Sequence, residues 1–141
     1  MNKRHWPAAI LGFGLVTAFI AACGSATSPT PPPQAKDNPS FAADIQPIFN
    51  AGCAAASCHG GSAQAGLVLT SGQAYANIVN VASTQDPTKF RVLPSDAANS
   101  YIVIKLEGRQ TVGTRMPQGS TLNAVSIQNI KNWINRGAGN N

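Results

Sequence analysis

The sequence predicts one small domain that begins and ends with a helix, and two observations support this. Apolar residues recur at helical spacing in residues 41–49 and again in residues 125–136. The region from position 40 to position 141 contains about 100 residues without an internal repeat, which is the size of a single domain. We therefore expect one packed unit with helices at both of its ends.

The first predicted helix covers residues 41–49. Its apolar residues lie at i, i+4, i+7 and i+8, which places them on one helix face. Ser40 directly precedes this pattern and is a favourable N-cap. Pro47 lies inside it, so we expect Pro47 either to kink the helix or to begin a second turn.

The last predicted helix, residues 125–136, has the clearest pattern. Three isoleucines and Trp133 line one face, Asn123 can cap the start, and Gly137 can end the helix. Residues 101–106 fit two structures. They are apolar and β-branched like a strand, yet Ser100 and Gly108 could bound a short helix, so both structures remain open.

Residues 1–22 are typical of an export signal. Lys3 and Arg4 are followed by an uncharged run, residues 8–22, that would span only about 22 Å as a helix, short of the ~30 Å hydrocarbon core. The ending at residues 20–23 resembles the bacterial lipoprotein signal, in which the cysteine is lipidated. We expect Cys23 to carry lipid. The alternative is an ordinary signal peptide that leaves Cys23 as a free thiol.

Residues 23–39 are rich in proline, serine and threonine and have little apolar surface to bury. We expect them to form a disordered tether that reaches about 50 Å when extended. The protein would then be exported and anchored by lipid to a membrane, facing the periplasm or the cell exterior. Gly24 after the cysteine suggests the outer membrane by analogy with enteric lipoproteins.

The charge pattern excludes one class of partner. The net charge is +5, part of which belongs to the signal, and lysine and arginine are not clustered. Nucleic-acid-binding proteins usually carry such clusters, so no nucleic-acid partner is expected.

The most informative motif is Cys53-Ala-Ala-Ala-Ser-Cys58-His59. Two thiols can add to the vinyl groups of a haem, and a histidine directly after the second cysteine can then bind the iron. The common motif has two residues between the cysteines, whereas this chain has four. Two alternatives remain open: a disulfide between Cys53 and Cys58 in a haem-free protein, or a zinc site.

Met116 is the candidate for the second axial ligand. It is the only methionine that remains after the signal, and it lies among glycine, arginine and proline residues typical of a loop. The alternative is a methionine that fills the core. Because histidine and methionine form a standard axial pair in cytochromes c, we expect His59 and Met116 to bind the iron.

Taken together, residues 41–139 resemble a small mono-haem cytochrome c domain of the type found in bacterial lipoproteins. The matching segments are residues 41–49, 58–60, 66–69, 91–94, 100–101, 116–117 and 133–138, in the family's order. The resemblance implies an all-α fold wrapped around one covalent haem c, with the first and last helices crossing near Trp133. The four-residue gap between the cysteines departs from the usual pattern and puts one thioether in question.

The resemblance also suggests residues of the haem pocket. Leu67 and Leu69 would line it, Tyr101 would pack against the haem, and Arg91 would reach a haem propionate or else be a solvated surface charge. The implied function is transfer of single electrons to and from redox partner proteins, without enzymatic activity. The alternatives are a haem enzyme or gas-binding domain with an open sixth position, and a haem-free surface lipoprotein stapled by a disulfide.

Overall fold

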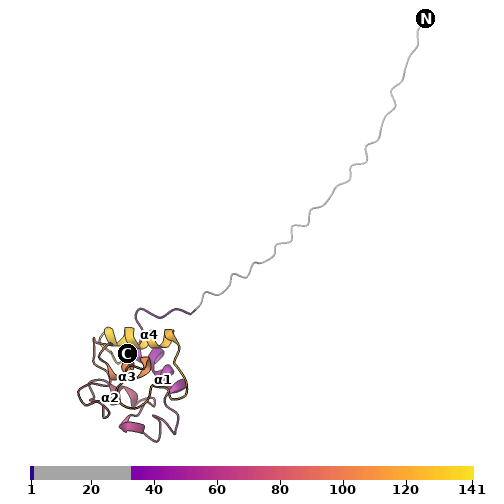
Figure 1. Cartoon of the computed structure of the whole chain (residues 1–141). Coiled ribbons are helices and arrows are strands. Elements are labelled where there is room, and N and C mark those ends of the chain that lie inside the picture. The colour runs from indigo at the N-terminus through magenta and orange to yellow at the C-terminus, as the bar shows by residue number, and fades with distance from the viewer. Residues whose placement is uncertain (2–32) are drawn as a thin grey trace. The chain divides into compact units, whose positions relative to one another are not determined.

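The computed structural model describes Met1 and residues 33–141, and within this part of the chain the structure is helical. The predicted signal peptide, Cys23 and the linker up to residue 32 lie outside the described residues. Two isolated β-bridges, Val79 with Val92 and Ala82 with Phe90, occur, and the described residues form no strand. The prediction of an all-α fold is therefore confirmed for the secondary structure of the described residues. The elements are η1 (Phe41–Ile45), α1 (Gln46–Gly52), η2 (Gln64–Gly66), α2 (Ala74–Ile78), α3 (Tyr101–Glu107) and α4 (Ala124–Asn135) (Figure 1).

The first predicted helix is two consecutive elements. The Ser40 hydroxyl accepts a hydrogen bond from the Ala43 amide (3.2 Å) and caps η1, a single π-helical turn, as expected. Pro47 lies in the first turn of α1. Its missing N–H costs nothing there, because the first amides of a helix have no partner within the helix. The proline therefore begins a second helix.

The ambiguous segment forms helix α3. Gly108 ends it with φ of +77°, a left-handed conformation that glycine adopts without strain. The prediction that Ser100 caps this helix is wrong for its side chain, which makes no capping hydrogen bond to α3. Its hydroxyl accepts from the Leu93 amide (2.9 Å) and donates to the Asp96 carbonyl (2.8 Å), so it braces the preceding turn.

Helix α4 has the predicted caps and packs on the first element. The Asn123 side chain accepts from the Ser126 amide (2.8 Å), and Gly137 follows the helix. Trp133 is 1% exposed, and its ring centroid lies 5.3 Å from that of Phe41. Its indole N–H donates to the Gly139 carbonyl (2.8 Å). The two ends of the domain therefore meet at an aromatic core, as expected.

The chain before Ser40 is also attached to the domain. The Lys36 amide donates to the Asn129 side chain (2.7 Å), and its carbonyl accepts from the Asn132 side chain (2.7 Å). Lys36 also forms an ion pair with Asp44. Lys36, before the predicted start of the domain, thus contacts α4. The carbonyl of the next residue, Asp37, accepts from Arg136, which directly follows α4. Among the described residues, no helix is long and apolar enough to cross a membrane.

Candidate functional site

One cavity of about 540 Å³ brings the predicted site residues together. Ligand pockets in proteins typically measure roughly 300–1,000 Å³. Its walls include the cysteine motif, the segment that follows it, the inner sides of α3 and α4, and the loop that carries Met116. All of the candidate haem residues in the described chain line it: Cys53, Cys58, His59, Leu67, Leu69, Arg91, Tyr101 and Met116.

The cysteine motif folds as a compact loop at the end of α1. Cys53 follows the last helical residue, and its carbonyl accepts from the His59 amide (3.1 Å), which closes the loop over the five intervening residues. Gly60 comes next and makes this closure feasible. A Cβ at this position would lie 2.5 Å from the Ala54 oxygen and 2.8 Å from the Ala55 oxygen, so only glycine fits without a shift of the backbone.

The hydrogen bond of the His59 ring determines which nitrogen can bind a metal. Nδ1 lies 3.1 Å from the Gln64 carbonyl oxygen. A carbonyl can only accept, so Nδ1 carries the proton in the neutral ring and donates it. The lone pair is then on Nε2. This is the arrangement that fixes a metal-binding histidine, because a carbonyl partner sets both its tautomer and its orientation.

The two thiols differ in their environment. Both cysteines are free, Cys58 being exposed and Cys53 half-buried. Burial, with a smaller contribution from nearby Cys58, raises the pKa of Cys53 to about 11. The Cys53 thiol is therefore protonated at neutral pH. A protonated thiol is a poor nucleophile, which disfavours spontaneous disulfide exchange by Cys53.

Met116 lies in the loop between α3 and α4, and this loop is tied to the end of α3. The Met116 amide donates to the Lys105 carbonyl (3.0 Å), and Arg115 Nε donates to the Leu106 carbonyl (2.8 Å). Lys105 Nζ donates to the Val112 carbonyl (3.1 Å). These contacts hold a half-buried thioether at the cavity wall.

The segment after the motif forms an apolar wall. The Leu69 amide donates to the His59 carbonyl (2.7 Å), which attaches this segment to the motif loop. Leu69 is 2% exposed and Leu67 is half-buried. Both side chains line the cavity that His59 also lines.

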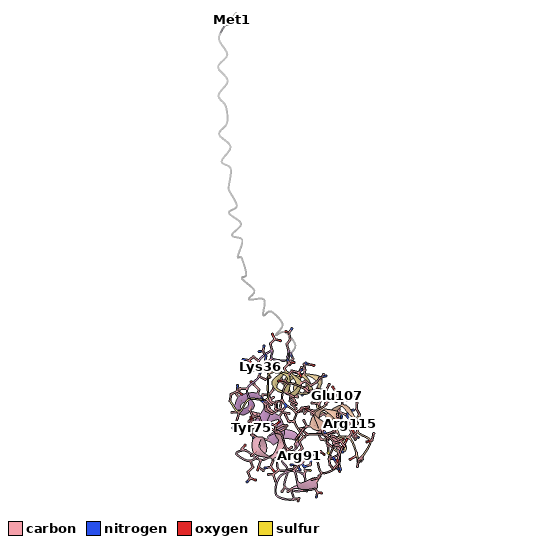
Figure 2. The ribbon with its side chains drawn as sticks, turned by 90° about the vertical axis from the view of Figure 1, so that its left-hand side faces the viewer. Met1, Lys36, Tyr75, Arg91, Glu107 and Arg115 are labelled. Atoms are coloured by element: carbon pink, nitrogen blue, oxygen red, sulfur yellow. The ribbon has the colours of Figure 1, made fainter. Side chains whose placement is uncertain are left out.

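Arg91 is buried, so the alternative of a solvated surface charge is wrong. It is 8% exposed. Figure 2 shows Arg91 at the end of the domain opposite Lys36. Its guanidinium donates to the carbonyls of Asn77 (2.8 Å), Gly66 (3.1 Å) and Ala65 (3.3 Å). Burial lowers the pKa of Arg91. The guanidinium joins α2 to η2 and places positive charge at the cavity wall.

Sequence reasoning did not identify Lys105 as a site residue. Lys105 lies on α3, is 6% exposed and lines the cavity. The signal was present in the sequence: a single lysine interrupts the apolar run of residues 101–106. A lysine within such a run is costly to bury unless something compensates its charge.

Within Met1 and residues 33–141, no group of three or more histidine, cysteine, aspartate or glutamate side chains is placed to hold a metal ion. The zinc alternative therefore has no ligand set in this part of the chain. Comparison of the whole chain with protein-family models, curated proteins and solved structures finds no match.

Proposed function

We propose that this protein is a membrane-anchored c-type cytochrome that carries single electrons through one covalently bound haem. One observation carries the proposal. Cys53, Cys58 and His59 of the motif line the same cavity as Met116, which is far from them in the chain. Two thiols, one imidazole and one thioether are together the donor set that a His/Met-ligated haem c requires.

The side chains at the cavity fit this group in further respects. The tautomer set by the Gln64 carbonyl leaves His59 Nε2 able to bind iron. The walls near the motif are apolar, as a macrocycle requires. Arg91 and Lys105 also line the cavity, whereas no aspartate or glutamate does. A cavity with buried cations suits a ligand that carries carboxylates, and haem carries two propionates.

Each residue then has a defined role. Cys53 and Cys58 would hold the cofactor by thioether bonds, and His59 and Met116 would bind its iron. When bound, the haem supplies the redox chemistry, taking up and releasing one electron between Fe(III) and Fe(II). With His59 and Met116 both bound to the iron, no position would remain for a substrate. Met116 and the apolar wall would favour the ferrous state and thereby raise the reduction potential.

The proposal extends to the part of the chain before the domain. Lipid on Cys23 would attach the protein to a membrane, and the proline-rich segment would separate the domain from it. Electrons would pass between the exposed haem edge and redox partner proteins on the exported side of that membrane.

The test is production of the full chain in a bacterium that has haem-attachment machinery. Denaturing electrophoresis with haem staining and intact mass should show one haem that survives acid–acetone extraction. Cys58→Ala should lose most of the covalent haem. Cys53→Ala should retain some, because the wide gap makes its thioether the one in question. Ser57→Ala, beside Cys58, is the matched control and should keep full staining.

The alternatives give different results. A colourless protein whose mass is lower by two hydrogens would be the disulfide-stapled lipoprotein, and the proposal would be wrong. A haem protein whose reduced form binds CO readily would have an open sixth position, which indicates a gas-binding or enzymatic domain.

A further inference from the structure

Tyr101 has a buried hydroxyl without a partner. The residue is 7% exposed, lines the cavity, and its oxygen makes no hydrogen bond with the described residues. Burial raises its pKa, and Asp86 adds to this effect. Asp86 itself accepts from Thr88 (2.6 Å). A buried hydroxyl without a partner destabilises the fold, and phenylalanine would fill the same space without this cost.

Lys105 lies on the same face of α3 as Tyr101. The two residues are at i and i+4, and Lys105 Nζ lies 5.8 Å from the centre of the Tyr101 ring. The side chain does not extend to solvent, since the residue is 6% exposed. Its ammonium has one hydrogen bond, to the Val112 carbonyl, and forms no ion pair in the described chain. At least two of its three donor hydrogens therefore have no acceptor among the described residues.

We propose that Tyr101 and Lys105 form a carboxylate-binding subsite of the cavity and hold one propionate of the haem. The inference rests on the proposed function. The hydroxyl would donate to one carboxylate oxygen, and the ammonium would donate to the same group and neutralise its charge. A single carboxylate would then supply an acceptor for the Tyr101 hydroxyl and a negative charge for the Lys105 ammonium. Arg91 already uses three of its five N–H groups on carbonyls of another wall. By contrast, the Tyr101 hydroxyl has no hydrogen-bond partner in the described chain and the Lys105 ammonium has one.

The experiment uses the holoprotein with its covalent haem. Tyr101→Phe removes one oxygen and keeps the ring, and Lys105→Met removes the charge and keeps most of the volume. Lys89→Met is the control, because Lys89 loses the same charge but does not line the cavity. Haem staining first shows whether each variant holds haem. Resonance Raman spectra then give the frequency of the propionate bending vibration, and an electrode gives the reduction potential.

We expect the bending frequency to shift downward in Tyr101→Phe and in Lys105→Met, because a hydrogen bond stiffens this motion, and to stay unchanged in Lys89→Met. The potential should fall more in Lys105→Met than in the control. Haem-loaded Tyr101→Phe and Lys105→Met proteins with wild-type Raman spectra would overturn the subsite and leave the cytochrome proposal standing. A wild-type protein without haem would overturn both.

Discussion

Replacement of Met116 separates an iron ligand from a side chain that only fills space. In Met116→Ala the loop should keep its position, because it is fixed through the Met116 amide and the Arg115 side chain rather than through the thioether. The haem should remain covalently bound. The variant therefore removes the sulfur and part of the packing while it leaves the rest of the site in place.

The expected loss of stability follows from burial. Full burial of a methionine side chain contributes about 1.5–3 kcal/mol, and Met116 is half-buried, so lost packing alone should cost about 1 kcal/mol. Leu122 provides the matched control, because it is also half-buried and lines the same cavity. If Met116 binds iron, Met116→Ala should cost up to about 3 kcal/mol and exceed Leu122→Ala by about 1–2 kcal/mol.

The assays are urea unfolding, the absorption spectrum, CO binding and the reduction potential. Met116→Ala should change from a low-spin six-coordinate iron to one that binds water or CO, and its potential should fall. Leu122→Ala should keep the wild-type spectrum. Met116→Leu preserves volume and would cost less than about 1.5 kcal/mol for a core filler, yet it should show the same spectral change. Wild-type spectra and potentials in both Met116 variants would refute the axial role.

Three further predictions concern the lipid anchor at Cys23, the thiol of Cys53 and Gly60, which follows the motif. Cys23→Ala should lose acyl label and membrane association, and wild-type protein recovered without added acyl mass would contradict lipidation. In protein produced without haem, the rate of Cys53 alkylation should rise about tenfold per pH unit up to a pH of about 11, because that is the pKa of the buried thiol. A rate that reaches its plateau near pH 8.5 would indicate an ordinary exposed cysteine. Gly60→Ala should destabilise the domain by about 1–3 kcal/mol and reduce haem attachment. Gly61→Ala, where the nearest atom would be 3.9 Å away, should behave like wild type in thermal unfolding and haem staining; equal behaviour of the two variants would show that the loop adapts.

The amino-acid sequence determined the features that depend on neighbouring residues. Ser40 and Asn123 cap helices because their side chains reach amides three residues ahead, and Pro47 begins a helix because its ring constrains its own backbone. The cysteine motif is likewise local, since its chemistry follows from the order of three side chains in one short loop. Such features can be recognised without knowing what packs against them.

Only the tertiary structure decided the features that depend on burial. Residues 101–107 form a helix rather than a strand, a choice that short apolar runs leave open until their packing is known. Arg91 and Lys105 resemble surface charges in the sequence, but long-range packing buries both at one cavity. The presence of His59 and Met116 at one cavity depends on the same packing. Spacing along a chain does not encode which distant side chains share a cavity, because that is set by how the helices pack around a common core.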